Sequence, residues 1–186
     1  PKVVPYFDLS FQHAHPDVLR RMKRFGGTKD FLNLINSIRK ISPTAGIRSN
    51  FIVGFPGETE NEFAEIQNFL EQAQLDAIGI FGYSVEDGTE AANFSDTLAQ
   101  EVVDERVKNL NTIAQELMSQ RAHQRIGEDV EVLVEASDED GLTGRIMQQG
   151  PEVDGITTIL DSVASVGELV KAVVVGSVGA DLEVKT

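Results

Sequence analysis

The sequence contains no cysteine, no tryptophan and no long apolar run. Without cysteine, both a disulfide and a thiolate-bound iron–sulfur cluster are excluded within this chain. Because there is also no basic leader followed by an apolar segment, we expect no membrane partner and a cytoplasmic location. The remaining composition, 41% apolar and 25% charged, is typical of a folded soluble protein.

Basic residues are scarce. The chain has 16 Lys and Arg against 30 Asp and Glu, a formal net charge of −14 at pH 7. Attraction to phosphate needs clustered Lys and Arg, so this charge argues against nucleic-acid binding by the whole surface and favours a basic partner. Acidity that only maintains solubility explains the same charge equally well.

The stretch IRSNFIVGFPGETENEF, residues 47–63, combines several local signals. A short apolar run predicts a buried strand, and Gly54 and Gly57 then bracket a sharp turn. Thr59 with Glu62 forms a capping box at the start of an amphipathic helix. A strand, a glycine turn and a helix start leave free N–H groups at the carboxyl edge of a sheet, where α/β proteins bind ligands.

Strands and helices alternate through the first two thirds of the chain. Further strands are predicted near residues 3–11 and 77–84, and helices from Pro16 to Gly26-Gly27, from a cap at Thr28, and over residues 99–124. This alternation implies a parallel sheet with right-handed crossovers. Three such strands are about half of a typical barrel, so we expect residues 1–124 to be the C-terminal half of a parallel (β/α) barrel whose N-terminal half is missing.

The pattern changes after Arg125. Short Val- and Ile-rich runs separated by glycines predict a small antiparallel β-barrel over residues 125–186. This segment has 13 Asp or Glu and 4 Lys or Arg, a net charge of −9, whereas residues 1–124 carry −5. The acidity is therefore concentrated in the predicted β-barrel.

Functional groups of a parallel barrel lie at the carboxyl ends of its strands. The polar residues predicted at this rim are Gln12, Asn50, Glu58 and Tyr83. No Ser/His/acid or Cys/His arrangement identifies a catalytic residue.

Two basic motifs near the first strand are weaker signals. His13 and His15 could chelate a metal, but no third ligand is nearby in the sequence, and we predict no metal site. A cluster of cations could contact phosphate, although such a cluster is more often the solvated face of a helix. Its members are Arg20, Arg21, Lys23 and Arg24.

These residues together resemble the C-terminal portion of a radical S-adenosylmethionine methylthiotransferase. The resemblance rests on the segments DLSFQHAHPDVLRRMKR, RSNFIVGFPGETENEF and DAIGIFGYSVEDGTEAA, followed by the long helix and a terminal barrel similar to a TRAM domain. FQHA and FGYSVEDGT resemble the RimO branch, which methylthiolates the β-carbon of an aspartate in the basic small-subunit ribosomal protein S-twelve. The acidic barrel agrees with that partner, since it would repel the phosphates of tRNA. The tRNA-modifying MiaB branch and a non-catalytic acidic module that binds a basic protein stay open as alternatives.

The resemblance also implies residue roles. The family's S-adenosylmethionine contact pattern, G-x-I-x-G-x-x-E, is matched with Asn50 in place of its first glycine and the acid one place late at Glu58. The residues implied to bind this cofactor are Gln12, Asn50, Ile52, Gly54, Phe55 and Glu58, and those implied to line the substrate side are Tyr83 and Ser84.

The complete family enzyme is implied to use S-adenosylmethionine and two [4Fe–4S] clusters. Reductive cleavage of the cofactor gives a 5′-deoxyadenosyl radical, which abstracts hydrogen from the aspartate β-carbon before sulfur is inserted. This chain lacks the C-x-x-x-C-x-x-C triplet that holds the cleaving cluster. We therefore expect a fragment that holds no cluster and is inactive alone.

Overall fold

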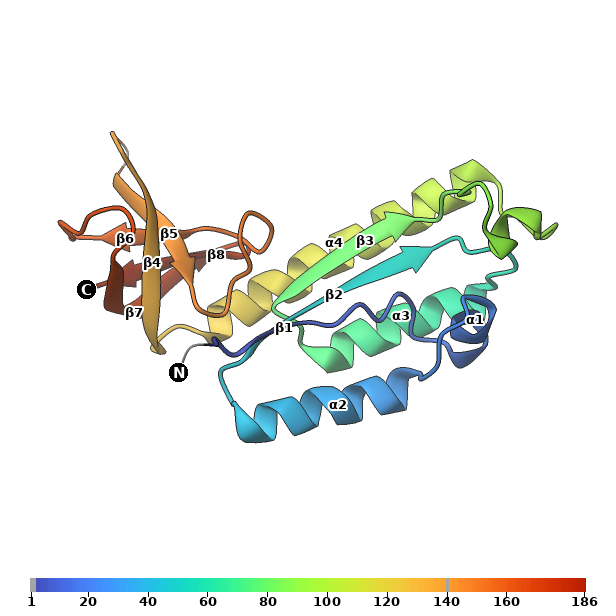
Figure 1. Ribbon diagram of the computed structural model, residues 1–186, viewed down its shortest axis with the longest axis horizontal. Helices are drawn as coiled ribbons and strands as arrows, with labels where there is room; N and C mark the ends of the chain where they lie inside the picture. Colours follow the sequence, from blue (N-terminus) through green and yellow to red (C-terminus); the bar gives the residue numbers. More distant parts are fainter. Residues whose placement is uncertain (1–2, 140) are drawn as a thin grey trace.

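Three parallel strands form the sheet of the first part of the chain (Figure 1). The computed structural model describes residues 3–139 and 141–186. The strands are β1 (Tyr6–Asp8), β2 (Gly46–Val53) and β3 (Ala77–Gly82), and β2 lies between the other two. β1 is shorter than the strand predicted over residues 3–11, because beyond Asp8 the chain pairs with β2 again only at a single bridge from Gln12 to Phe51.

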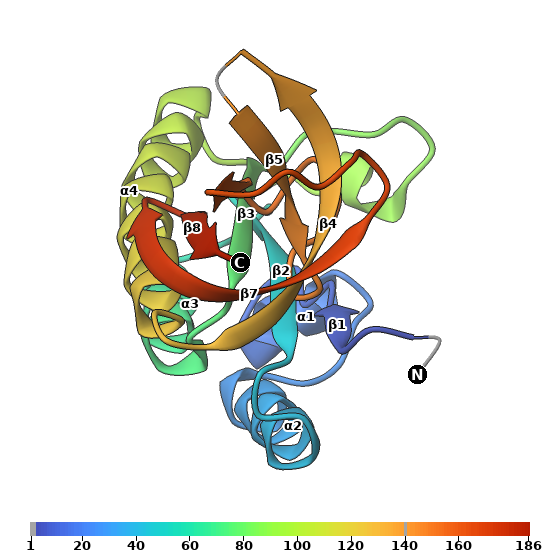
Figure 2. The same cartoon turned by 90° about the vertical axis from the view of Figure 1, so that its left-hand side faces the viewer.

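The helices described in this part are α1 (Pro16–Arg21), α2 (Thr28–Ile41), α3 (Glu60–Ala73), the 3-10 helix η1 (Glu90–Asn93) and α4 (Gln100–Gln124). The three long helices cover one face of the sheet (Figure 2). Phe51 and Val53 of β2 point into the core beneath these helices, beside Phe69 and Leu110. Alternate residues of β2, such as Asn50, lie half-buried on the opposite, open face.

Most predicted helices are confirmed, with two corrections. The first helix ends at Arg21 and not at Gly26-Gly27, because Lys23 has the left-handed φ of 59° and interrupts the helical path. Thr28 is the first residue of α2 and not its cap: Gly27 holds the cap position, and the Thr28 hydroxyl donates to Glu65 at 2.5 Å. The capping box of α3 is present as predicted.

The second part is a closed five-stranded barrel. Its strands are β4 (Asp129–Asp138), β5 (Gly141–Ile146), β6 (Thr157–Leu160), β7 (Leu169–Val178) and β8 (Asp181–Lys185), in the order β4-β5-β6-β8-β7. Alternating valines, including Val130, Val132 and Val134, fill its core. The predicted barrel is confirmed, but it is mixed and not purely antiparallel, because β6 and β8 close it as a parallel pair.

The barrel packs against the amino-terminal ends of the sheet strands through two carboxylates, of which Asp154 is buried and Asp76 is largely buried. Asp154 accepts hydrogen bonds from the Tyr6 hydroxyl and from Arg48 Nη1, the latter at 2.9 Å. Burial, together with this hydrogen bond to Asp154, raises the pKa of Tyr6 above its ordinary value, so the hydroxyl stays a donor.

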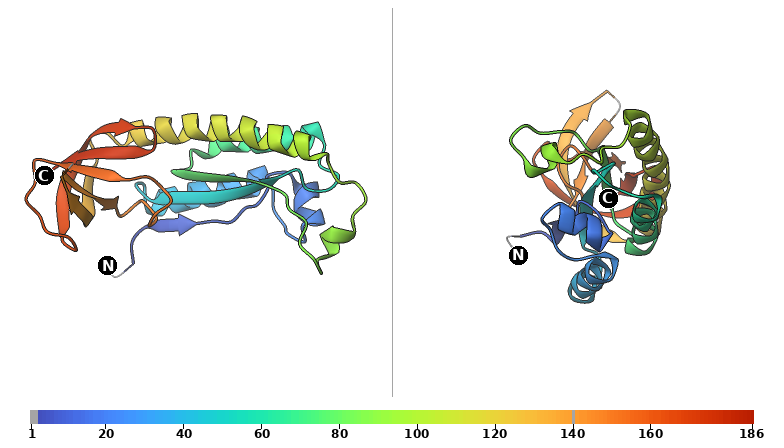
Figure 3. Two further views of the ribbon diagram at one scale, coloured as in Figure 1. Left: turned by 90° about the horizontal axis from the view of Figure 1, so that it is seen from above. Right: turned by 90° about the vertical axis from the view of Figure 1, so that its right-hand side faces the viewer.

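Asp76, just before β3, is the second carboxylate at this interface. Its Oδ1 accepts from Arg121 Nε at 2.9 Å and from Arg125 Nη2 at 2.5 Å, and its Oδ2 accepts from the backbone N–H of Ile47 at 2.9 Å. The barrel therefore lies at one end of the molecule and the carboxyl ends of the strands at the other, with α4 running between them (Figure 3).

Among the described residues, every helix is too short or too polar to span a membrane.

Candidate functional site

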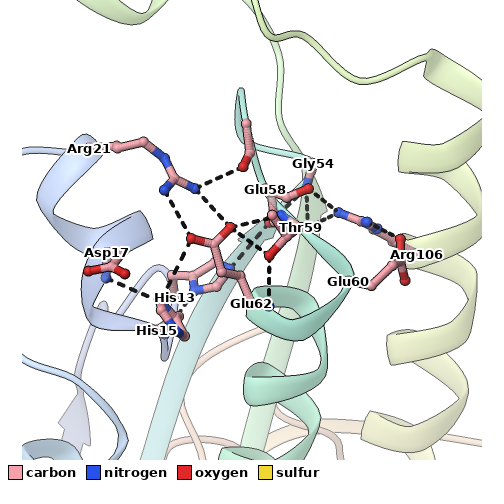
Figure 4. Close-up of polar contacts among 11 residues, drawn as sticks. His13, His15, Asp17, Arg21, Gly54, Glu58, Thr59, Glu60, Glu62 and Arg106 are labelled. Atoms are coloured by element: carbon pink, nitrogen blue, oxygen red, sulfur yellow. Dashed lines mark hydrogen bonds and ion pairs between the residues drawn. The ribbon is translucent and has the colours of Figure 1, made fainter.

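The glycine turn after β2 is held from inside the protein by Glu58 (Figure 4). Gly54 has φ of 78°, a conformation that suits glycine, and its N–H lies 3.1 Å from each carboxylate oxygen of Glu58. Arg106 of α4 donates from Nη1 to the same carboxylate at 2.5 Å and to the Glu58 carbonyl at 3.2 Å. The carboxylate of Glu58 is therefore directed at the turn and at α4 and away from the rim.

His13 completes this buried network. Its Nδ1 accepts the N–H of His15 at 3.0 Å, so the ring proton is on Nε2, which lies 3.2 Å from Glu58 Oε2 and donates to it. Both nitrogens of His13 are thus engaged, and Nδ1 of His15 accepts the N–H of Asp17 at 3.2 Å. The two imidazoles do not form the chelate that the H-x-H motif could have provided.

A second acid, Glu62, ties α3 to α1. It receives two hydrogen bonds from the guanidinium of Arg21, at 3.0 and 3.1 Å, and closes the capping box with Thr59. Burial alone would raise the pKa of Glu62, but the hydrogen bonds from Arg21 and Thr59 outweigh it and lower the pKa to about 2. Although His15, Asp17 and Glu62 bring possible ligand atoms within 4.8 Å of one another, these hydrogen bonds already engage His15 Nδ1 and the Glu62 carboxylate.

A hollow of about 280 Å³, called here the rim pocket, lies at the carboxyl ends of the three strands. Four predicted site residues line it: Gln12, Ile52, Phe55 and Tyr83. The rest of its wall comes from the end of α1 with the residues after it and from the start of η1 with its N-cap, namely Arg21, Met22, Lys23, Arg24, Thr89, Glu90 and Ala91. A larger hollow of about 680 Å³ lies at the other end of the molecule, between Pro5 and the barrel, and contains none of the predicted site residues.

The rim pocket is amphiphilic. Ile52 and Phe55 give it apolar walls, and the side chain of Tyr83 packs edge-on against Phe55 with ring centroids 5.1 Å apart. Its polar groups include the hydroxyl of Tyr83 and Nε of Arg21, both buried and without a hydrogen-bond partner among the described residues. Buried polar atoms are normally paired, so these two are available to a ligand.

The other predicted residues lie outside the rim pocket. Asn50 is on the open face of the sheet, where its Oδ1 accepts from Arg48 Nη2 at 3.4 Å. Ser84 is exposed, and its hydroxyl donates a hydrogen bond to Glu86 Oε1 at 3.4 Å. Gly54 is in the turn behind the pocket, and Glu58 faces inward as described above. The structure thus brings together Gln12, Ile52, Phe55 and Tyr83, but not all the residues expected at a common rim.

Sequence reasoning missed Arg106. A signal for it was present, since Arg106 falls on the buried stripe of α4 with Val103 and Leu110, three residues before it and four after it. A buried arginine requires an acidic partner, but the sequence does not show that this partner is Glu58.

The residues present fit one of the two implied cofactors. The apolar walls and the unpaired donors of the rim pocket suit a ligand with a flat apolar part and an anionic or polar end, as S-adenosylmethionine has. No residue of this chain can ligate an iron–sulfur cluster through a thiolate.

Comparison with known proteins identifies two families in the chain. Residues 2–70 match the radical SAM superfamily, and residues 126–186 match the TRAM domain. The chain is 56% identical over its whole length to a protein of Saccharopolyspora erythraea named ribosomal protein uS12 methylthiotransferase RimO, of which it covers 38%. Proteins of the same name from Streptomyces avermitilis and Cutibacterium acnes are 54% and 53% identical, over 98% and 97% of this chain and 37% and 38% of theirs.

These matches confirm the resemblance drawn from the sequence. The chain is homologous to a part of the RimO-type methylthiotransferases and consists of a partial radical SAM domain followed by a TRAM domain. It spans about 38% of the length of the curated relatives that it matches.

Proposed function

Proceeding from this homology, we propose that the chain is the part of a RimO-type enzyme that carries one wall of the cofactor site and the module that docks the substrate. The complete enzyme would methylthiolate the β-carbon of an aspartate in ribosomal protein uS12. The observation that carries this proposal is 56% identity, over the whole of this chain and 38% of the relative, to a protein named for that activity. The rim pocket supports it, because it gathers four of the residues that the family resemblance assigns to cofactor and substrate.

Within this site, we assign S-adenosylmethionine to the rim pocket. Ile52 and Phe55 would contact its apolar part, and Gln12 and Tyr83 would donate or accept hydrogen bonds at its polar end. When bound, the cofactor supplies the radical that removes hydrogen from the substrate. Glu58 acts indirectly, since its carboxylate fixes the N–H of Gly54 and thereby the turn behind the pocket. The iron–sulfur clusters would be held by cysteines elsewhere in the complete enzyme, and this chain alone would be inactive.

The charge of the barrel supports a protein substrate. With 13 acidic and 4 basic residues, residues 125–186 attract a lysine- and arginine-rich ribosomal protein and repel the phosphate backbone of tRNA.

The test is a titration of the chain with uS12 and, separately, with bulk tRNA, each at low and high salt. We expect binding to uS12 that weakens as salt rises, and no comparable binding to tRNA. Preference for tRNA would contradict the assignment and favour the tRNA-modifying branch. In the complete enzyme, Gln12→Ala should impair cleavage of S-adenosylmethionine, and unchanged cleavage would remove Gln12 from the site.

A further inference from the structure

The cation cluster at the end of α1 lies largely at the rim pocket and not on a solvated helix face. Arg21, Lys23 and Arg24 line the pocket, whereas Arg20 does not. Arg21 is already engaged, because its guanidinium donates two hydrogen bonds to Glu62. Lys23 and Arg24 are therefore the cations at this site that the proposed function does not yet use.

Lys23 occupies a backbone position that normally belongs to glycine. The N–H of Arg24 binds the carbonyl of Leu19 at 2.7 Å, and the N–H of Lys23 binds the carbonyl of Arg20 at 3.0 Å, which is the Schellman pattern at a helix end. Lys23 has φ of 59° there, in the left-handed region that disfavours a side chain. Among the described residues, five other than glycine have a positive φ, and two of them, Gln12 and Lys23, line the rim pocket. Backbone strain of this kind is typical of functional sites, where the side chain is needed.

The ammonium group of Lys23 already binds a carboxylate. Its Nζ lies 3.2 Å from Oε2 of Glu90, so this ion pair joins the two walls of the pocket, one after α1 and one at η1 (Figure 1). The two side chains are 71% and 66% exposed, and ion pairs exposed to this degree stabilise a protein only weakly. A carboxylate from another molecule can therefore take the place of Glu90.

Arg24 has no acidic partner within the part of the chain that the structure describes. Its Nη1 donates to the carbonyl of Ser10 at 3.1 Å, which fixes the guanidinium beside the segment that follows β1. The side chain is otherwise exposed. Because a guanidinium carries five N–H donors in a rigid fork, Arg24 keeps donors that fit a carboxylate.

We propose that Lys23 and Arg24 form a carboxylate subsite that holds the side chain of the aspartate to be modified. This inference rests on the proposed function and names the residues that recognise its substrate. The carboxyl carbon of aspartate is bonded directly to the β-carbon, so a fixed carboxylate also fixes the β C–H bonds beside the cofactor in the same pocket. Both cations are exposed, which suits a group that arrives on another protein. The carboxylate of S-adenosylmethionine has the same chemistry, and the test separates the two sources.

The first test removes each cation in the complete enzyme. Lys23→Gly places glycine at the left-handed position, so the thermal midpoint should stay unchanged or rise while the ammonium group is lost. We expect Lys23→Gly and Arg24→Gln each to raise the Kd for uS12 about tenfold, as for the loss of a hydrogen-bonded charge. Arg20→Gln is the matched control: it removes the same charge from α1 outside the pocket and should change the Kd less than about twofold.

The sign of the effect at Glu90 is a second readout. Glu90→Gln frees Lys23 and should lower the Kd for uS12 about twofold. General attraction between an acidic enzyme and a basic substrate predicts the opposite for both variants, with weaker binding in Glu90→Gln and tighter binding in Lys23→Gly. That opposite pattern would overturn the carboxylate subsite.

The third test uses uS12 whose modified aspartate is replaced by asparagine. The wild-type enzyme should bind this form about tenfold more weakly than normal uS12, and the double variant Lys23→Gly/Arg24→Gln should bind the two forms within about twofold of each other. An equal preference for aspartate in both enzymes would overturn the proposal. Affinity for S-adenosylmethionine, measured by calorimetry without uS12, should change less than about twofold in the double variant. A tenfold loss of that affinity with uS12 binding intact would assign the subsite to the cofactor and overturn the proposal, whereas absence of uS12 binding to the wild-type enzyme would overturn the proposed function itself.

Discussion

The hydroxyl of Tyr83 is buried at the rim pocket without a hydrogen-bond partner in the described part of the chain. An unpaired buried polar group destabilises a protein by about 1–3 kcal/mol, so Tyr83→Phe should preserve or raise the free energy of unfolding. The same variant should weaken binding of S-adenosylmethionine to the complete enzyme by about tenfold, because the ligand loses one hydrogen bond. Denaturant unfolding and calorimetric titration measure the two effects. Lower stability with unchanged affinity would show that the hydroxyl has only a structural role.

Arg106 is the residue on which the buried charge of Glu58 depends. Arg106→Met keeps much of the side-chain volume but leaves the Glu58 carboxylate with only neutral donors, from His13 and Gly54. Breaking a buried ion pair in this way should lower the free energy of unfolding by about 3–5 kcal/mol, measured by denaturant unfolding.

The matched control for Arg106→Met is Glu60→Gln. Glu60 pairs with the other Nη atom of Arg106, but its side chain is 80% exposed, so we expect a change below about 1 kcal/mol. Similar losses in Arg106→Met and Glu60→Gln would mean that the buried carboxylate is not what Arg106 stabilises.

Glu62 predicts a pH dependence. Its pKa is lowered from 4.5 to about 2, so the folded state binds its proton less readily than the unfolded state. The resulting stability is fully present above pH 4.5 and is lost as the pH falls from 4.5 towards 2, with a total on the order of 3 kcal/mol. Unfolding of the wild type and Glu62→Gln should therefore differ most near pH 7 and converge near pH 2. A difference that is constant with pH would contradict this assignment.

At the scale of elements, the glycine turn and α4 pack too closely to admit a side chain. A Cβ added to Gly54 would lie 2.6 Å from a methyl group of Val103, and φ at Gly54 is 78°. Gly88 has a similar φ of 80° but nothing within 4 Å of an added Cβ. Gly88→Ala should lower the free energy of unfolding by about 1 kcal/mol, the cost of placing alanine at a positive φ. Gly54→Ala should lower it by at least about 2 kcal/mol, because the added methyl group also meets Val103. Denaturant unfolding measures both changes. Adding Val103→Ala to Gly54→Ala should restore part of the lost free energy of unfolding. Equal decreases in the free energy of unfolding for Gly54→Ala and Gly88→Ala would contradict the close packing.

The elements that sequence patterns predicted well are those whose signals are local. α3 has its capping box and α4 its long apolar stripe, and both lie where the residue patterns placed them. The corrections concern non-local or backbone features. The parallel pairing of β6 with β8 depends on how the barrel closes, and the early end of α1 depends on the left-handed backbone of Lys23.

In the candidate site, too, the features set by local sequence were predictable and those set by distant residues were not. Gln12 and Tyr83 line the rim pocket, as expected for residues at strand ends, because the carboxyl ends of parallel strands meet at one edge; Ile52, which only the family resemblance implied, lines it with them. The direction of Glu58 was not predictable, since it is set by Arg106, which is 48 residues away in the sequence. A local motif that places an acid beside a turn leaves open whether the carboxylate points outward to a ligand or inward to a helix.

At the scale of the whole molecule, Asp76 is the clearest point at which to uncouple the barrel from the sheet. Asp76→Asn would leave the guanidinium groups of Arg121 and Arg125 facing a neutral amide at a mostly buried interface. We expect the free energy of unfolding to fall by about 3–5 kcal/mol. We also expect the α/β part and the barrel to unfold separately, which calorimetry would show as two transitions in place of one. Asp161→Asn is the control, because Asp161 pairs with Lys185 on the barrel surface and its side chain is 77% exposed.

The consequence of Asp76→Asn for binding follows from the same geometry. A barrel freed from the sheet still carries its exposed carboxylates, so its affinity for intact uS12 should change by less than about twofold. Its fixed distance from the rim pocket would be lost, whereas Asp161→Asn keeps the wild-type arrangement of the two parts. If Asp76→Asn instead unfolds in one transition at the wild-type temperature, then packing of Ala122 and α4 in the barrel core is sufficient to fix the barrel, and the interface ion pairs are not required to hold it in place.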